Sequence, residues 1–248
     1  FPGRIDLGIG RGPGGMPLAS LALRYGRQKE PDERFLGMLL ELASFLGLGN
    51  WFPDDHPFGD LLTTPLVDTA PDVWLLGSSD YSARVAAELG AGFSFAHFIN
   101  GAGGHDAVRY YMEHFRPGPF GDRPRASVCV AVICAETAEK AEEFASAYDL
   151  RLLFLDKGER HRLFPSPEEV RSYPYTEMDR MIIRDNRRRM IVGDPEKVRS
   201  ELLRFSEEYG VHEILVNTMI HDFRDRLRSY ELLAEMFLRQ EGGGSRLD

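Results

Sequence analysis

Short apolar runs alternate with longer amphipathic stretches along the chain. Five runs have the length and the apolar content of buried strands: Ile5–Gly10, Val73–Leu76, Phe93–Ala96, Ser127–Cys134 and Glu213–Val216. Helical periodicity and end signals predict helices at Pro31–Leu48, Tyr81–Leu89, Asp106–Phe115, Ala138–Tyr148, Asp194–Tyr209 and Asp225–Arg239. This order predicts an α/β fold with a parallel sheet, either a doubly wound open sheet or part of a (β/α)8 barrel. Leu150–Met190 has no clear period, and Gly242–Asp248 is expected to be a flexible tail.

Composition and charge narrow the range of partners. The chain has 248 residues, 43% apolar and 28% charged, as in ordinary globular proteins. A formal net charge of −9 argues against nucleic acid or an anionic membrane as partner. No apolar run reaches the roughly 18 residues of a membrane span. Cys129 and Cys134 are expected on opposite faces of one strand, so we predict no disulfide, no metal site and a reducing, cytoplasmic compartment.

The first predicted strand ends in a glycine-rich loop, G-I-G-R-G-P-G-G at residues 8–15. Gly10, Gly12 and Gly15 match the dinucleotide fingerprint G-x-G-x-x-G. The fingerprint also requires an acidic residue at the end of a second strand about 20 positions later, and no strand lies there. A Rossmann fold is therefore weakly supported. Arg11 stands among these glycines and has the chemistry to hold a phosphate bidentately, although a surface arginine fits the position too.

The second predicted strand ends in a loop with three serines, W-L-L-G-S-S-D-Y-S at residues 74–82. The helix that follows has N–H groups without partners in its first turn, and its dipole favours an anion there. Ser78, Ser79 and Ser82 add hydroxyl donors, so the loop predicts a phosphate site. The residues alone leave equally open that Ser78, Ser79 and Asp80 only cap the helix. Because its carboxylate would repel a phosphate, Asp80 is expected to cap the helix with its side chain turned aside.

Segments in consistent order resemble the bacterial-luciferase-like flavin monooxygenases. P-G-R-I-D-L-G-I-G-R-G-P-G at residues 2–14 is similar to the family's fourth-strand motif, and V-W-L-L-G-S-S-D-Y-S-A-R-V-A-A-E-L-G at residues 73–90 to its fifth unit. Further matches follow at Phe93–His97, Val128–Cys134, Ile191–Val198 and Arg228–Glu235. The resemblance implies a TIM (β/α)8 barrel, represented here by strands 4–8. We expect one domain over residues 1–241, with a variable insertion at about 150–190.

The same resemblance implies a cofactor and its site. Members of the family use reduced flavin mononucleotide (FMN), or in some branches the deazaflavin F420, with oxygen and a small organic substrate. By this match, the residues expected at the cofactor are Arg11, Pro13, Ser78, Ser79 and Ser82 at the flavin phosphate and Ala96 near its ring. His97 is a catalytic candidate, although a hydrogen-bonded histidine at a strand end is the commoner role. A flavin reductase and a homo-oligomeric partner copy are also implied.

The family's first three β/α units have no counterpart before Pro2. They carry a strand-end histidine implicated in catalysis and most of the dimer interface, so we expect this chain to be the C-terminal part of a barrel. Two functions follow: a flavin-dependent oxidoreductase, or a degenerate barrel that keeps the phosphate site without redox chemistry. Aromatic and apolar side chains in the insertion either line a substrate pocket or pack the insertion itself: Phe154, Phe164, Tyr173, Tyr175 and Met178.

Overall fold

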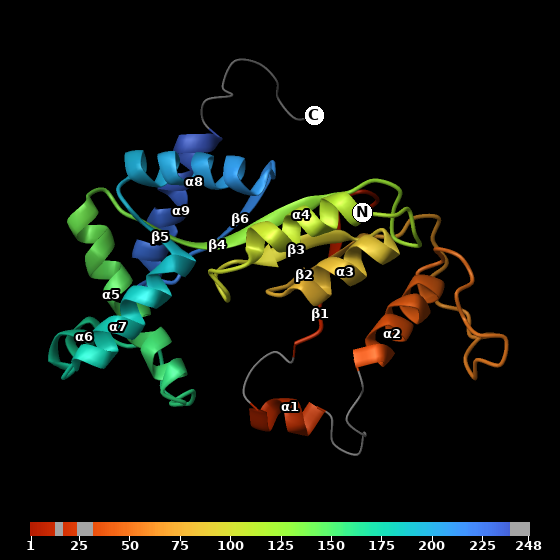
Figure 1. Cartoon of the computed structure of the whole chain (residues 1–248), viewed down its shortest axis with the longest axis horizontal. Helices are drawn as coiled ribbons and strands as arrows, with labels where there is room; N and C mark the ends of the chain where they lie inside the picture. Colours follow the sequence, from red (N-terminus) through yellow and green to blue (C-terminus); the bar gives the residue numbers. More distant parts are fainter. Residues whose placement is uncertain (13–16, 24–31, 239–248) are drawn as a thin grey trace. The chain divides into compact units, whose positions relative to one another are not determined.

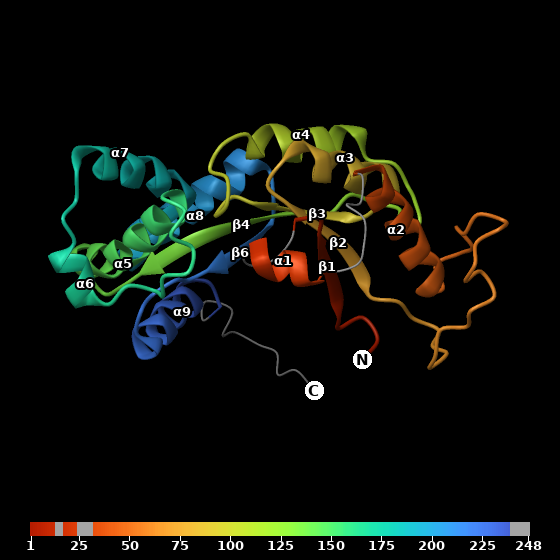
Figure 2. The same ribbon diagram turned by 90° about the horizontal axis from the view of Figure 1, so that it is seen from below.

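Strands and helices alternate through the part of the chain that the computed structural model describes, residues 1–12, 17–23 and 32–238 (Figure 1, Figure 2). The strands are β1 (Asp6–Gly10), β2 (Asp72–Gly77), β3 (Gly92–Ala96), β4 (Ala126–Cys134), β5 (Met190–Gly193) and β6 (Glu213–Asn217). The helices are α1 (Pro17–Leu23), α2 (Asp32–Phe45), α3 (Asp80–Leu89), α4 (Gly104–His114), α5 (Ala138–Asp156), α6 (Pro167–Ser172), α7 (Glu177–Asn186), α8 (Pro195–Tyr209) and α9 (Phe223–Phe237). A 3-10 turn, η1 (Arg187–Arg189), precedes β5.

The five predicted strands are all present. The segment predicted to be irregular, Leu150–Met190, is instead largely helical. Helix α5 continues eight residues beyond its predicted end at Tyr148, and α6 and α7 follow it. Strand β5 is a sixth strand that the apolar pattern did not predict. Thr176 and Asp179 form a reciprocal capping box that begins α7. The predicted tail, residues 242–248, lies outside the described residues.

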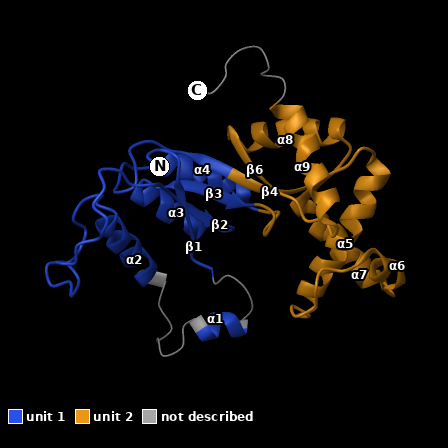
Figure 3. Cartoon of the chain, turned by 180° about the vertical axis from the view of Figure 1, so that it is seen from behind, with its two compact units in different colours: residues 1–96, 103–127 blue, residues 97–102, 128–248 orange. Residues whose placement is uncertain are grey.

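The chain divides into two compact units, which we describe separately: unit 1 is residues 1–96 and 103–127, and unit 2 is residues 97–102 and 128–248 (Figure 3). In unit 1, β2 pairs in parallel with β1 and with β3. The register opposes Gly10 to Leu76 and Gly77 to Phe95, so the three strands reach their carboxyl ends at one edge. That shared edge is where parallel α/β folds bind ligands.

Helices α3 and α4 lie side by side over one face of the unit 1 strands (Figure 1, Figure 2). The ring of Phe93, in β3, lies 5.6 Å from the ring of Tyr111, in α4. Tyr111 is fully buried, donates its hydroxyl to the Ala91 carbonyl at 2.8 Å and accepts from the Arg125 N–H at 2.9 Å. This hydroxyl satisfies two backbone groups that burial would otherwise leave unpaired.

In unit 2, β4 pairs with β5 in parallel and also with β6. Alternate residues of β4 join two different apolar clusters, because successive side chains of a strand point to opposite faces. Ala131 and Ile133 pack with α5, whereas Val130, Val132 and Cys134 pack with α8 and α9.

Cys129 and Cys134 are both free thiols, and the alternation places them on opposite faces of β4, as the spacing predicted. No helix formed by the described residues combines the length and apolar character needed to cross a bilayer.

Candidate functional site

The carboxyl ends of β1, β2 and β3 bring the predicted phosphate residues to one edge of unit 1. Arg11 directly follows β1, and Ser78 directly follows β2. Ala96 is the last residue of β3 and is 9% exposed. Since Gly77 is opposite Phe95 in the register, Ala96 lies beside the start of the serine loop. The structure thus gathers residues that are up to 85 positions apart in the sequence.

An aromatic ring in the first turn of α3 holds the Arg11 side chain. The guanidinium carbon of Arg11 lies 4.2 Å from the ring centroid of Tyr81, a cation–π distance. The Tyr81 ring also contacts Phe35, in α2, at 6.5 Å between centroids. Tyr81 therefore fixes a positive charge at the same helix end where N–H groups lack partners within the helix.

Ser79 is the N-cap residue of α3, yet its side chain makes no capping hydrogen bond. A serine that only capped the helix would accept a bond from an N–H group of the first turn. The geometry therefore does not favour the alternative in which Ser79 serves only as a cap. The prediction that Asp80 caps α3 is wrong: Asp80 is the first helical residue, and its exposed side chain lines a surface pocket shared with α4.

Ser82 has a different environment from the other two serines. Its side chain is 6% exposed and packs against the backbone of Gly77, so closely that a Cβ atom at residue 77 would overlap the Oγ and Cβ atoms of Ser82. Glycine at this position lets α3 approach the end of β2. Ser78 is half-buried and Ser79 exposed, so these two hydroxyls are the more accessible.

The donors assembled at this edge match the chemistry of a phosphate dianion. They are the guanidinium of Arg11, the Ser78 and Ser79 hydroxyls and the first-turn N–H groups of α3. Pro13, also predicted at the phosphate, lies outside the described residues. The prediction missed Gly77 and Tyr81. The G-S-S-D-Y-S string contains the signal for both, a glycine at the strand end and an aromatic ring one helical position after Asp80.

His97, the catalytic candidate, begins unit 2 and is 7% exposed. Its Nε2 lies 2.9 Å from the Arg188 carbonyl oxygen, and its Nδ1 lies 2.9 Å from the Tyr209 hydroxyl. Because a carbonyl oxygen can only accept, Nε2 carries a proton and donates it to the Arg188 oxygen. In the neutral ring Nδ1 therefore accepts a hydrogen bond from the Tyr209 hydroxyl. Burial, with Glu208 nearby, raises the pKa of Tyr209 to about 12, which keeps that proton on its oxygen. Both ring nitrogens thus support the packing of this region, as expected of a hydrogen-bonded strand-end histidine.

Most of the insertion's aromatic residues pack the insertion itself. Phe154 is fully buried, with Tyr173 and Tyr175 packed against its cluster. Phe164 packs against another cluster, and Met178 is 63% exposed. Within residues 1–12, 17–23 and 32–238, no group of three or more His, Cys, Asp or Glu side chains is arranged to hold a metal ion.

Comparison with known proteins places these features in a family. The family model described as luciferase-like monooxygenase matches residues 1–213. The chain is 50% identical to the Bacillus subtilis protein YwcH, over 95% of this chain and 70% of that protein. It is 34% identical to the Bacillus subtilis N-acetyl-S-alkylcysteine monooxygenase, over 96% of this chain and 70% of the relative.

The structure is also similar to solved ones. The crystal structure of apo-MsnO8 matches with a TM-score of 0.77 and 33% identity, over 96% of this chain and 69% of that one. The matches confirm the predicted α/β fold of the TIM-barrel type. The family match over most of the sequence, together with the two relatives, shows that this chain belongs to the luciferase-like monooxygenase family.

Proposed function

We propose that the protein is a flavin-dependent monooxygenase whose flavin phosphate binds at the edge formed by Arg11 and the Ser78–Ser82 loop. The observation that carries the proposal is the guanidinium of Arg11 held 4.2 Å from the Tyr81 ring, at the amino end of α3. It lies beside a serine N-cap whose hydroxyl makes no capping bond. Family membership supports FMN as the flavin, with F420 as the alternative cofactor.

The chain's own residues account for binding and orientation of the cofactor. Arg11 would offset part of the phosphate charge, and the N–H groups at the start of α3 would donate to the phosphate oxygens. Ala96 has no side chain beyond Cβ, so at the end of β3 it would leave more room for a planar ring system than a larger residue would. When bound, reduced flavin supplies the electrons for reaction with oxygen, and the protein positions the substrate and excludes water.

The phosphate contribution is tested by comparing FMN with riboflavin, which has the same ring system and no phosphate. Titrations followed by flavin fluorescence should show tighter binding of FMN to the wild-type chain. Arg11→Gln should remove roughly 1.5–3 kcal/mol from FMN binding, about a tenfold to hundredfold loss, and leave riboflavin unchanged. Arg123→Gln is the matched control, because Arg123 is exposed in the same unit and distant in sequence from the serine loop.

Equal affinity for FMN and riboflavin in the wild-type chain would refute the phosphate site. Tight binding of F420 without binding of FMN would assign the deazaflavin instead. The relative named N-acetyl-S-alkylcysteine monooxygenase makes small thioethers the first substrates to test for oxygen consumption with reduced FMN. Binding of flavin with no turnover of any substrate would favour the degenerate, non-catalytic barrel.

A further inference from the structure

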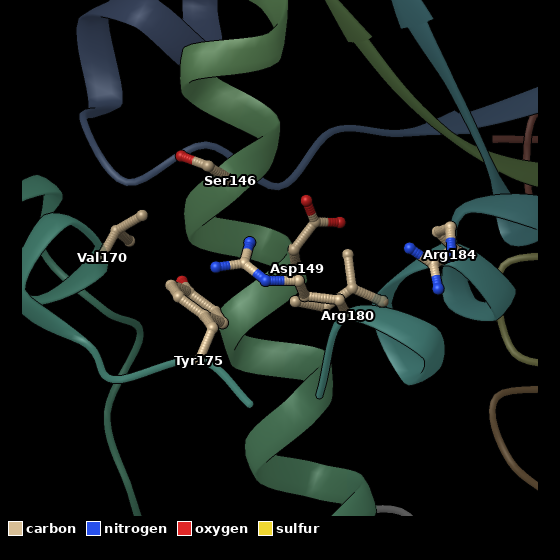
Figure 4. Close-up of a pocket in the computed structure, with 7 residues that line it drawn as sticks. Ser146, Asp149, Val170, Tyr175, Arg180 and Arg184 are labelled. Atoms are coloured by element: carbon tan, nitrogen blue, oxygen red, sulfur yellow. The ribbon is translucent and has the colours of Figure 1, made fainter. Parts of the chain in front are cut away.

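A second pocket lies in unit 2, among α5, α6 and α7, and the flavin site does not use it. Its volume is about 350 Å³, near the lower end of the roughly 300–1,000 Å³ typical of small-molecule sites. Val170 and Ile183 form its apolar wall, and Tyr175 adds an aromatic ring. The guanidinium of Arg180 points across the pocket toward Val170, between Ser146 and Tyr175 (Figure 4).

Two arginines of α7 line this pocket without carboxylate partners. Within the described residues, neither Arg180 nor Arg184 forms an ion pair, although the chain is acidic overall. The guanidinium carbon of Arg180 lies 5.7 Å from the centroid of the Tyr175 ring. What sets Arg180 apart is its place: its guanidinium faces an apolar wall and an aromatic ring inside a pocket, where its fork of N–H donors suits an external anion.

The carboxylate that lines the pocket is already neutralised. Asp149 is 6% exposed and accepts two hydrogen bonds from Arg187, at 2.7 and 2.8 Å. Arg187 also pairs with Glu142 at 2.8 Å. Asp149 is therefore paired with a third arginine, Arg187, and not with Arg180 or Arg184. The pocket thus has a positively charged side and an apolar wall, so a matching ligand carries both a negative group and an apolar group.

We propose that this pocket binds a small organic anion, a carboxylate attached to an apolar or aromatic body. The carboxylate would pair bidentately with Arg180, while the body packs against Val170, Ile183 and the Tyr175 ring. Burial raises the pKa of Tyr175, so its phenol stays protonated at neutral pH and keeps a proton to donate to the ligand. The proposal is independent of flavin binding, since every residue that it uses lies in unit 2.

Calorimetric titration of the flavin-free full chain with benzoate tests this site. Benzoate should bind saturably, and benzamide, which has the same ring without the charge, should bind roughly tenfold more weakly or not at all. Inorganic phosphate should also bind more weakly than benzoate, because it lacks the apolar body. Arg180→Gln should weaken benzoate binding by roughly tenfold or more.

Arg199→Gln is the matched control, because Arg199 is exposed on α8 and does not line the pocket. Both pocket arginines are exposed at the surface, so the variants should keep the wild-type circular dichroism spectrum. The proposal is overturned if benzoate does not bind saturably, if benzamide binds equally well, or if Arg180→Gln does not weaken binding more than Arg199→Gln. Phosphate binding as tight as that of benzoate would overturn the role of the apolar wall.

Discussion

Gly77→Ala is the substitution that most directly tests how the end of β2 positions α3. Gly77 is the last residue of β2, and an added Cβ would overlap the Oγ and Cβ atoms of Ser82. Ser82 is 6% exposed in the first turn of α3, so its side chain has little room to move away. A change of rotamer would move only the Ser82 Oγ atom, so relief of the overlap with Cβ requires α3 to shift away from the end of β2.

The expected cost follows from overpacking of a well-packed site, about 1–3 kcal/mol of unfolding free energy. Gly37→Ala is the matched control, because Gly37 is inside α2 and its added Cβ would meet no atom within 4 Å. That change should stabilise the protein by roughly 0.5–1 kcal/mol, since alanine loses less conformational freedom in a helix. Glycine-to-alanine substitution is thus expected to lower the free energy of unfolding at residue 77 and to raise it at residue 37.

Urea denaturation followed by circular dichroism measures both free energies. A second variant, Gly77→Ala with Ser82→Gly, removes the atoms that the new Cβ overlaps. It should recover part of the loss, less about 1 kcal/mol for a glycine inside a helix. In the Gly77→Ala variant, the ratio of FMN to riboflavin affinity should also fall, because the amino end of α3 is displaced. Equal stability of Gly77→Ala and wild type would refute the close packing of Gly77 against Ser82, and so would simple additivity of the two single-variant losses in the double variant.

Two further predictions concern stability. Tyr111→Phe should cost about 2–4 kcal/mol in urea denaturation, because it leaves the buried Ala91 carbonyl and the half-buried Arg125 N–H without their partner. Tyr148→Phe is its control and should cost far less, since that hydroxyl makes no hydrogen bond within the described residues; equal losses would contradict the argument. Lys157 lies 2.7 Å from Asp179 and holds the pKa of that carboxyl below its usual value. The ion pair therefore stabilises the folded state fully above the unfolded pKa of about 3.9, and this stabilisation is lost as the pH falls through the lower pKa of the folded state. Asp179→Asn should lower the urea midpoint at pH 7 and flatten its decline toward pH 3, whereas an unchanged acid profile would show that the pair does not contribute.

The sequence pattern predicted strands and helices best where each had its own boundary signal. Glycine at residue 90 ends α3, and Asp194 with Pro195 begins α8, so both helices were located within one residue. Strand β5 was missed because four residues between an arginine run and an aspartate are too short to show a period. It forms because its backbone hydrogen-bonds in parallel to β4, along Ala131–Cys134.

The insertion was predicted poorly because its helices are short and strongly charged. The Thr176–Asp179 capping box was nevertheless present in the sequence and could have located α7. At the phosphate site, the residue types predicted Arg11 and the serines, but only the register of β1, β2 and β3 shows that they share one edge. No sequence pattern could show that Arg180 and Arg184 make no ion pair with the described part of the chain, because that depends on where α7 packs.

The opposite orientations of Cys129 and Cys134 in β4 bear on how well the protein tolerates oxidants. Burial raises the pKa of both thiols, and Cys134, with Asp194 and Glu136 nearby, reaches about 11. At pH 7 only ~10⁻⁴ of Cys134 is then thiolate, the form that peroxides attack. Neither sulfur has the other as a resolving partner. A protein proposed to bring reduced flavin and oxygen together therefore keeps both thiols largely protonated, which lowers their reactivity toward peroxides.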